Sequence, residues 1–499
     1  MYRQVLIWFL LLAFTNAVPL VTRLPPDDPS VSNSKEEESE DEDVFSQILR
    51  TNKGSNVKLY HGDIVVDRSY SAAKCPNCFW PKSEDGVVRV PYSLAPDYSD
   101  ANKVLIISAL ETFMTLTCVR FMERTTEKDY LQISSGSGCW SSVGKVGGAQ
   151  TISLMTPGCM ARGVVQHEIE HALGFYHEQS RSDRDENLDV MWQYINEADW
   201  GEFDLVDTNN MDLPYDYSSV MHYGKFAYSN TSDQPSLSPK PDQSVEIGQR
   251  YGLSPLDVTK VKKLYDCDIC SFLLTGNNGS LDFDTFTSSY KDSSSCVWLV
   301  RVNRNKAFLQ FDSFDVPFSA ECATYYITVY DGPSRKSPVL IDRMCGTHVL
   351  PLMVASGTSL LLEFGYEAHR AAVDLKASYG LVDCGGTYTM DNGTVTSPLY
   401  PYPYPNLSDC FTAIWAPEGY QIVLNFTAFD VEYSSSCLFD YLLVYDGGRT
   451  DSLLLGRFCS KGPTSPLTSS GNALLLEFRS DHWYNLAGYA ANYYFVQSS

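Results

Sequence analysis

The sequence predicts a multidomain fold in which one α+β domain is followed by two all-β sandwiches. Three observations support this prediction. The chain has 499 residues, too many for one hydrophobic core, and roughly three domains are expected at this length. The spacing of cysteines in the C-terminal half repeats itself. Before the repeats lies a segment with one helix-like stretch, two strand-like stretches and a cluster of histidines.

Composition and charge limit the class of protein. Hydrophobic residues make up 44% and aromatic residues 13% of the chain, which suits a folded protein rather than a disordered one. The formal net charge is −24. Nucleic acid is therefore not an expected partner, because phosphate binding needs clustered Lys and Arg side chains.

Residues 1–17 predict a secretory signal peptide. Arg3 precedes the ten apolar residues Val5–Phe14, and Thr15 and Ala17 form a cleavage site of small residues. Neither this run nor any later one approaches the ~20 apolar residues of a membrane helix. We therefore expect a soluble, secreted protein, with secretory granules as one route of export. Five Asn-x-Ser/Thr sites for N-glycosylation agree with secretion: Asn230, Asn278, Asn392, Asn406 and Asn425.

Two regions lie between the signal peptide and the repeats. In residues 18–70, the stretch KEEESEDED (Lys35–Asp43) is a run of like charges that repels itself, which we interpret as a solvated tail. Residues 71–269 are expected to form the α+β domain. There, Lys103–Phe121 has a helical period that places Ile106, Leu110, Phe113, Met114 and Leu116 on one face, and the strand-like YLQISS and AQTISL follow.

The stretch VVQHEIEHALGFYHEQ (164–179) predicts a metal site. On a helix, His167 and His171 lie one turn apart on the same face and can direct their rings at one point. Gly174 allows the left-handed turn that ends the helix, so that His177 can be a third ligand. Neutral imidazoles suit Zn²⁺, and three protein ligands leave a position open, as in catalytic zinc sites. Glu168 lies beside the first ligand, where it can reach a metal-bound water.

The alternative interpretation is a polar helix face without a metal. The short pattern HExxH occurs by chance, whereas HExxHxxGxxH fixes five positions in eleven. The longer pattern therefore favours the catalytic zinc site.

The C-terminal half contains two homologous modules, 270–382 and 384–497. The cysteine gaps are 26, 26 and 23 residues in the first module and 26, 27 and 22 in the second. The motif VYDG begins at Val329 and again at Val444, and LLLEF begins at Leu360 and again at Leu474. Each module has many short strands separated by turn residues, which is typical of an antiparallel sandwich.

These motifs resemble known families. The histidine motif, SVMHY (Ser219–Tyr223) and CWSSVGKVGGAQTISL (139–154) resemble the astacin family of zinc endopeptidases, which are metzincins with an active-site helix and a Met-turn. The repeats resemble CUB domains. An astacin domain followed directly by two CUB domains is most similar to the embryonic hatching enzymes of lower vertebrates, of the amphibian type, as is CPNCFWPKSEDGVVRVPY (75–92).

The astacin resemblance implies a set of site residues. His167, His171 and His177 would bind one zinc ion, and Glu168 would be the general base and later the general acid. Tyr223 would be a labile fifth ligand that moves to stabilise the oxyanion. Two structural roles are also implied: Met221 would lie beneath the metal as an apolar base, and Glu178 would receive the new α-amino group after activation.

The resemblance also implies a zymogen. LYHGDIVVD (Leu59–Asp67) is similar to the astacin pro-segment motif, in which Asp63 would take the place of water on the zinc. Gly62 would permit a close approach to the metal. The alternative is that HGD is a simple turn. An activating protease would cut between Arg68 and Ser71, so that residues 18–70 form the propeptide.

Seven disulfides and one calcium site follow from the same resemblance. The expected disulfides are Cys75–Cys78, Cys118–Cys267, Cys139–Cys159, Cys270–Cys296, Cys322–Cys345, Cys384–Cys410 and Cys437–Cys459. Many CUB domains bind Ca²⁺ through one Glu and two Asp, which are hard oxygen ligands. The second module has Glu432, Asp440 and Asp481, whereas the first has Pro317, Tyr325 and Glu367. Calcium is therefore expected in the second module, with surface acidic residues as the alternative.

Two classes of function remain. The first is a secreted zinc endopeptidase, expected as a monomer, that digests egg-envelope (vitelline or chorion) glycoproteins at hatching. A protease that processes extracellular matrix or growth-factor precursors is the alternative within this class. The second class is a binding protein with an inactive protease domain, and the presence of Glu168 and all three histidines argues against it.

Overall fold

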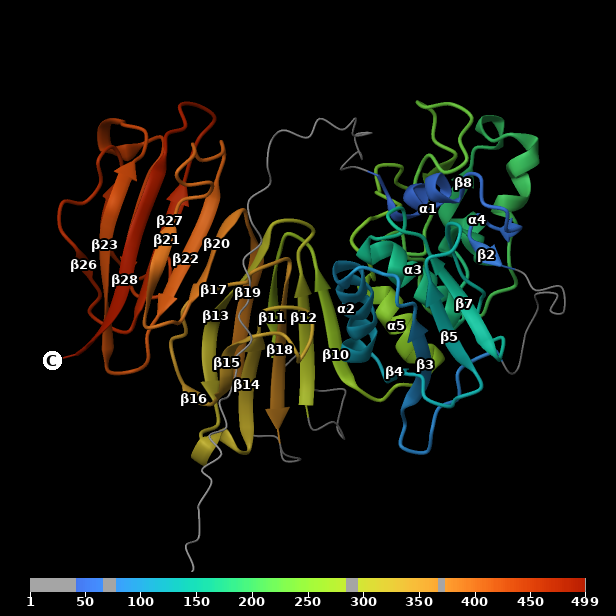
Figure 1. Ribbon diagram of the computed structural model, residues 1–499, viewed down its shortest axis with the longest axis horizontal. Helices are drawn as coiled ribbons and strands as arrows, with labels where there is room; N and C mark the ends of the chain where they lie inside the picture. Colours follow the sequence, from blue (N-terminus) through green and yellow to red (C-terminus); the bar gives the residue numbers. More distant parts are fainter. Residues whose placement is uncertain (1–41, 66–77, 284–294, 367–372, 499) are drawn as a thin grey trace, which may run out of the picture. The chain divides into compact units, whose positions relative to one another are not determined.

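The computed structural model describes residues 42–65, 78–283, 295–366 and 373–498 (Figure 1). The expected signal peptide, the activation cut between Arg68 and Ser71, and Cys75 lie outside these residues. The described chain from Asp43 onward belongs to one compact unit. Among the described residues there is no helix long and apolar enough to cross a membrane.

The α+β domain is built on a five-stranded sheet of order β4-β3-β5-β7-β6. β6 pairs antiparallel with β7, and the other pairs are parallel. Helix α3 contacts both α2 and β7. The elements are α1 (Val44–Asn52), β1 (Leu59–Tyr60), β2 (Ile64–Val65), β3 (Val88–Leu94), α2 (Asp100–Leu116), β4 (Val119–Glu123), β5 (Tyr130–Ser134), β6 (Cys139–Trp140), β7 (Ala149–Leu154), α3 (Arg162–Leu173), α4 (Arg184–Asn187), β8 (Leu188–Val190), β9 (Leu237–Pro239) and α5 (Pro255–Leu264).

The predicted helix is present but shorter than its apolar pattern. Helix α2 ends at Leu116, and the predicted segment continues as β4, which pairs with β3. Thr117 has extended backbone angles, and Cys118 is joined to Cys267 by a disulfide. The helical period could not show this change because Val119 and Phe121 are as apolar as the helix before them.

Helix α1 was not predicted. The acidic run that we interpreted as a solvated tail ends at Asp43, whose side chain accepts a hydrogen bond from the Ser46 N–H and caps this helix. Val44, Phe45 and Ile48 are buried in the core of the α+β domain. The signal was present in the sequence as an N-capping Asp followed by apolar residues at helical spacing.

Each C-terminal module is a sandwich of two sheets, as predicted, but it is not purely antiparallel, because β10 pairs parallel with β12 and β20 pairs parallel with β22. In the first, one sheet has the order β10-β12-β18-β14-β15 and the other β11-β19-β13-β16, with β17 also on β13. The second repeats this as β20-β22-β27-β24-β25 and β21-β28-β23-β26. Equivalent cysteines share a register, since Cys270 lies opposite Cys296 and Cys384 opposite Cys410 in parallel pairs.

The bounds of these strands are as follows. In the first module they are β10 (Cys270–Thr275), β11 (Asn278–Asp282), β12 (Ser295–Arg301), β13 (Lys306–Val316), β14 (Tyr325–Tyr330), β15 (Val339–Met344), β16 (Gly346–Thr347), β17 (Met353–Val354), β18 (Ser359–Tyr366) and β19 (Asp374–Val382). In the second they are β20 (Cys384–Tyr388), β21 (Asn392–Thr396), β22 (Asp409–Trp415), β23 (Tyr420–Asp430), β24 (Tyr441–Asp446), β25 (Leu453–Phe458), β26 (Leu467–Thr468), β27 (Ala473–Arg479) and β28 (Gly488–Gln497).

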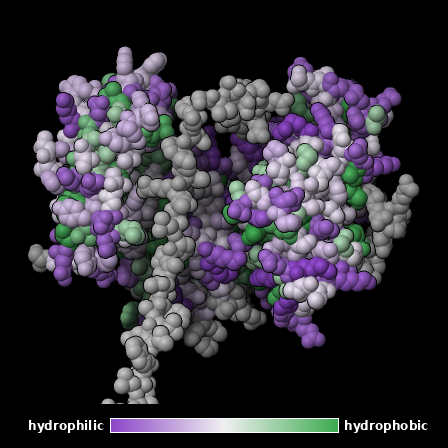
Figure 2. Space-filling view, in the orientation of Figure 1, coloured by the Kyte–Doolittle hydropathy of each residue, from purple (hydrophilic) through white to green (hydrophobic). Residues whose placement is uncertain are grey.

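The first sandwich shares a hydrophobic core with the α+β domain. Leu273, Val297, Leu299 and Leu361 belong to the same cluster of buried residues as the side chains of α2, α3 and α5. A polar contact accompanies this packing: Ser271 Oγ donates a hydrogen bond to the Leu116 carbonyl at 2.6 Å. The face drawn in Figure 2 is largely hydrophilic, with hydrophobic residues in small scattered groups.

Candidate metal centre and active site

Helix α3 carries the histidine motif and ends at Gly174. Gly174 has a φ of 114°, in the left-handed region, and the N–H of Phe175 donates to the Glu170 carbonyl at 3.1 Å. A Cβ at this position would lie 2.9 Å from the ring of Phe79. The glycine is therefore required by both backbone and packing, and it turns the chain back toward the helix so that His177 reaches the other two histidines.

The three histidine rings converge on one point. His167 Nε2 lies 3.1 Å from His171 Nε2 and 3.2 Å from His177 Nε2, and all three side chains are fully buried. Asp63 completes the group, with Oδ2 2.9 Å from His167 Nε2. Ligand atoms at 2.0–2.1 Å from a tetrahedral Zn²⁺ lie about 3.3–3.4 Å apart, so the observed separations fit that ion.

In two of the rings, a hydrogen bond at Nδ1 shows which ring nitrogen carries a proton. His167 Nδ1 lies 2.9 Å from the Val220 carbonyl, and His171 Nδ1 lies 2.8 Å from the Phe175 carbonyl. A carbonyl only accepts, so each Nδ1 carries a proton, and in the neutral ring each Nε2 then presents a lone pair. Two lone pairs and a carboxylate facing one another repel without a cation between them. The donor set therefore fits a divalent metal.

Glu168 is a buried carboxylate next to this group. Its two side-chain oxygens have no hydrogen-bond partner within the described part of the chain. Burial, together with the nearby charge of Asp63, raises the pKa of Glu168 well above its usual value. An unpaired carboxylate of raised basicity beside a metal site is suited to accept a proton from an attacking water.

The segment after the histidine helix supplies Met221 and Tyr223, both buried. The N–H of Glu178 donates to the Met221 carbonyl at 3.0 Å, which joins this segment to the third histidine. The Tyr223 hydroxyl donates to the His61 carbonyl at 2.8 Å, and its ring stacks on Phe45 with 3.6 Å between centroids. The segment that contains His61 thus holds the Tyr223 hydroxyl.

Hydrogen bonds to two backbone carbonyls hold the segment around Asp63 in place. The N–H of Ser141 donates to the Asp63 carbonyl at 3.1 Å, and Asn52 Nδ2 donates to the Gly62 carbonyl at 2.9 Å. Gly62 has a φ of 84°, and a Cβ there would lie 2.6 Å from the Tyr228 hydroxyl. This close approach brings Asp63 to the histidines. Sequence reasoning did not single out Asn52 or Phe45, whose roles depend on contacts far along the chain.

Glu178 is part of a buried ion cluster, which also contains Arg181, Asp216, Asp257 and Lys260. Its carboxylate is 2.6 Å from Lys260 Nζ and 3.1 Å from Arg181 Nη1. Burial alone would lower the pKa of Lys260, but the charges of Glu178, Asp257 and Asp216 outweigh it and raise that pKa above its usual value.

The three acidic residues expected to bind calcium are also together. Glu432, Asp440 and Asp481 offer oxygens that lie within 4.8 Å of one another. Asp440 is buried and accepts hydrogen bonds from the Tyr404 hydroxyl at 2.6 Å and the Asp481 N–H at 2.7 Å. The corresponding positions of the first sandwich hold Pro317 and Tyr325, and Glu367 lies outside the described residues.

The remaining expected positions are placed as follows. All five glycosylation-site asparagines are exposed. Cys75–Cys78 involves a residue outside the described chain. The structure contains the other six expected disulfides: Cys118–Cys267, Cys139–Cys159, Cys270–Cys296, Cys322–Cys345, Cys384–Cys410 and Cys437–Cys459.

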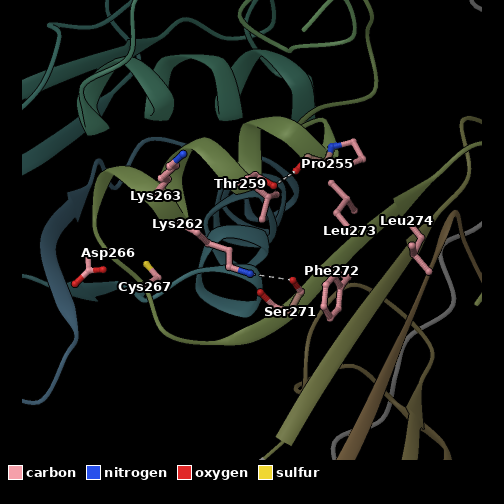
Figure 3. Close-up of a pocket in the computed structure, with 11 residues that line it drawn as sticks. Pro255, Thr259, Lys262, Lys263, Asp266, Cys267, Ser271, Phe272, Leu273 and Leu274 are labelled. Atoms are coloured by element: carbon pink, nitrogen blue, oxygen red, sulfur yellow. Dashed lines mark hydrogen bonds between the residues drawn. The ribbon is translucent and has the colours of Figure 1, made fainter. Parts of the chain in front are cut away.

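A surface pocket lies away from the histidines, between α5 and β10 (Figure 3). Its volume is about 500 Å³, and none of its lining residues belongs to the metal group. Lys262 Nζ crosses it to donate to the Ser271 carbonyl at 3.1 Å. Phe45, His61 and Asp63 instead pack against the histidine side chains.

Comparisons with known proteins agree with this arrangement. Residues 75–266 match the peptidase family Astacin, and residues 270–379 and 384–493 match the CUB domain. The chain is 42% identical to embryonic protein UVS.2 of Xenopus laevis over 458 residues, 91% of this chain and 88% of that protein. It is 47% identical to an astacin-like metalloendopeptidase of Gallus gallus over 345 residues, 69% of this chain and 84% of that one.

Solved structures are also similar to parts of this chain. High choriolytic enzyme 1, a hatching enzyme zinc-protease from the medaka Oryzias latipes, shares 44% identity with a TM-score of 0.38, covering 40% of this chain and all of that one.

Proposed function

Because this chain belongs to the astacin family of zinc metalloendopeptidases and carries two CUB domains, we propose that it is secreted as a zymogen and digests egg-envelope glycoproteins at hatching. The observation that carries this proposal is the similarity to the Xenopus embryonic protein, which extends through the protease domain and both CUB domains and covers most of both chains. The proposed partners are the envelope glycoproteins and an activating protease.

We propose the catalytic roles that the astacin family implies for the residues of this site. His167, His171 and His177 would hold the zinc, which when bound acidifies a water molecule and polarises the scissile carbonyl. Glu168 would take the proton of the attacking water and pass it to the leaving amine. Tyr223, once released from the His61 carbonyl, would donate its hydroxyl proton to the developing oxyanion. Asp63 would keep the zymogen silent by occupying the open side of the histidine group.

The second CUB domain is the proposed matrix-binding module. The loops around Asp440 are joined by hydrogen bonds from Tyr404 and Asp481, and calcium at Glu432, Asp440 and Asp481 would order them further. These loops expose large aromatic side chains, including Tyr402, Tyr433 and Trp483, which are each more than 70% exposed. Exposed aromatic groups of this kind are enriched in protein interfaces, so this surface supports a role in attachment.

A processing protease for matrix or growth-factor precursors is the second candidate. Tolloid-like protein 2 of Mus musculus is 33% identical over 83% of this chain, but the match covers 41% of that longer protein. The shared part includes the protease domain, so similarity of the active site does not separate the two candidates. The Xenopus embryonic protein, in contrast, is matched over most of its own length, and this favours the first candidate, the hatching role.

The test compares two substrates for the activated full-length enzyme. We expect rapid solubilisation of isolated egg envelope, and a rate ratio of envelope to short peptide that falls when Asp440 is changed to Ala, because attachment raises local concentration. Asp391→Ala, at an exposed position of the same domain, is the matched control. An enzyme that cleaves the peptide but leaves the envelope intact would contradict the hatching role.

A further inference from the structure

One buried arginine of the first CUB domain is only partly paired. Arg301 is the last residue of β12 and is 6% exposed. Its Nη2 donates to the Leu253 carbonyl at 2.7 Å, whereas Nε and Nη1 have no hydrogen-bond partner among the described residues. A buried cation is costly when no opposite charge accompanies it, and a native protein seldom leaves such a group without a partner. The two remaining nitrogens therefore suit a negatively charged partner.

The guanidinium of Arg301 lies beside the first turn of the histidine helix α3. A Cβ at Gly252 would be 3.2 Å from Arg301 Nη1, and a Cβ at Gly163, in that first turn, would be 3.4 Å from the Gly252 nitrogen. Gly252 thus contacts both the arginine and the helix. The turn itself is positive: it begins with Arg162, it contains no acidic residue, and Ala161 at the N-cap position has no side-chain oxygen to accept from the helix N–H groups.

The charges around Arg301 do not balance within the described chain. Burial and the charge of Arg162 lower the pKa of Arg301 to about 10, and Asp257 opposes them only in part. Asp257 already accepts from Ser219 Oγ at 2.6 Å and from the Val220 N–H at 2.8 Å, and it lies 3.6 Å from the ammonium of α5. Burial also lowers the pKa of Arg162, and no carboxylate opposes this effect. Two partly or fully buried guanidinium groups therefore share one weakly placed counter-charge.

We propose that Arg301 and Arg162 bind a small monovalent anion, chloride being the simplest, at the first turn of α3. The anion accepts hydrogen bonds from the free nitrogens of Arg301 and is favoured by the positive end of the helix dipole. One charge suffices because Asp257 supplies part of the balance. A small ion fits best, since a Cβ at Gly252 would already lie 2.2 Å from Gln166 Oε1. The anion thereby links the first CUB domain to the helix that carries His167, and it takes no part in hydrolysis.

The first experiment measures the thermal midpoint of the uncleaved full-length chain while chloride replaces gluconate at constant ionic strength. Chloride should raise the midpoint of wild type by about 3 °C and reach a plateau, because a ligand of the folded state stabilises it. Arg301→Gln should lose this shift. Arg304→Gln, at an exposed position just beyond β12, is the matched control and should keep it. General salt effects, and any chloride at the histidines, act on all three proteins alike.

Two outcomes of this experiment would overturn the proposal. One is a wild-type midpoint that does not differ between the two salts. The other is a chloride shift in Arg301→Gln as large as that of wild type. Sulfate is tested in the same way, and a larger shift with sulfate than with chloride at equal ionic strength would overturn the assignment to a monovalent ion.

A second variant keeps the question open to test if Arg301→Gln does not fold. Arg162 is only partly buried, so Arg162→Gln should fold and should need about tenfold more chloride to reach half of the midpoint shift. Chloride binding is also followed directly, by the excess line width of the ³⁵Cl NMR signal in the presence of the protein. Wild type and Arg304→Gln should broaden the signal equally, and Arg162→Gln should broaden it less. Equal broadening and equal chloride dependence in all three proteins would overturn the proposal.

Discussion

At the scale of single residues, the tautomers of two histidines determine what the site can bind. His167 and His171 each point Nδ1 at a backbone carbonyl, so their Nε2 lone pairs face the centre of the site. The ring positions come from helix spacing, but the carbonyls come from Val220 and Phe175, which lie outside the helix. These contacts orient the ligands before any metal arrives, which favours rapid and tight metal binding.

Glu168→Gln should abolish peptide hydrolysis while leaving metal binding intact. The amide keeps the size of the side chain but cannot accept the proton of water, so kcat should fall by about 10²–10⁴-fold. Zinc content should remain near one ion per chain by metal analysis of the purified enzyme. Glu197→Gln, at an exposed position, is the control. Activity within tenfold of wild type would show that Glu168 is not the base.

Asp63→Ala should give a leaky zymogen, with partial activity before cleavage or earlier self-processing than wild type. The substitution removes the carboxylate that lies 2.9 Å from His167 Nε2 and leaves the rest of the pro-segment contacts in place. The readout is hydrolysis of a small peptide by protein shown to be uncut on a gel. Asp97→Ala, which changes an exposed aspartate, should remain silent. If uncut Asp63→Ala protein is also silent, another part of the pro-segment is responsible for inhibition.

At the scale of secondary-structure elements, we expect helix α1 to hold the proposed pro-segment in place. Its Phe45 side chain is fully buried, stacks on Tyr223 and meets His177 edge-on at 5.2 Å. Phe45→Ala should cost about 3–5 kcal/mol of docking energy. We expect faster hydrogen exchange over residues 44–52 and earlier self-cleavage of the zymogen. Lys53→Ala, just beyond the helix, should change neither, and unchanged exchange in Phe45→Ala would refute this role.

Helix α5 contains Lys262, through which the stability of the folded protein should depend on pH. Burial lowers the pKa of Lys262 to about 8, against a weaker opposing effect of Asp268. Between pH 8 and the unfolded pKa of about 10.4, the unfolded chain binds more protons than the folded one, so stability should rise with pH. The burial penalty is fully present below pH 8 and amounts to at most about 3 kcal/mol.

The measurement is the thermal midpoint of wild type and Lys262→Met at pH 7.5 and 9.5. Lys262→Met has no proton to lose in this range, so the difference between variant and wild type should shrink or change sign as the pH rises. Lys263→Met is again the control, because its side chain is exposed. A difference that does not change with pH would show that Lys262 keeps its ordinary pKa in the folded protein.

At the scale of the whole molecule, the first CUB domain is part of the structure on which the protease domain rests. Leu273, Val297 and Leu299 are buried in the protease core cluster, and Arg301 Nη2 donates to the Leu253 carbonyl at 2.7 Å. The proposed catalytic residues all precede Cys267, so a chain that ends there retains every group that the proposed mechanism needs. It also exposes the apolar surface of α2 and α5 that this domain covers.

A chain that ends at Cys267 should therefore cleave a short peptide but unfold at a lower temperature, by at least about 5 °C, because buried apolar area is lost. A chain that ends at Asp383 keeps the first CUB domain and should match the full-length midpoint for the protease domain. Differential scanning calorimetry of the three proteins makes the comparison. Equal midpoints for both truncated chains would show that the first CUB domain adds no stability to the protease domain.

The sequence by itself determined the features that depend on local spacing. The histidine motif, the two strand-like stretches after the predicted helix, and the repeated cysteines each have a period or an offset that can be recognised in the sequence. The shared register of Cys270–Cys296 and Cys384–Cys410 confirms the repeat. The family resemblance added Asp63, Tyr223 and Glu178, whose roles no local pattern of this chain indicates.

The tertiary structure alone decided what these residues contact. Helix α2 ends at Leu116, which its apolar pattern did not indicate. Two contacts join distant positions of the chain: Phe45 stacks on Tyr223, and Lys260 pairs with Glu178. No periodicity records such contacts, because their energy comes from burial and from charges brought together only by the completed fold. Lys260 is an example. Helix α5 contains two other lysines, so the sequence suggests an exposed charge, and only the packing of α5 makes Lys260 the buried partner of Glu178.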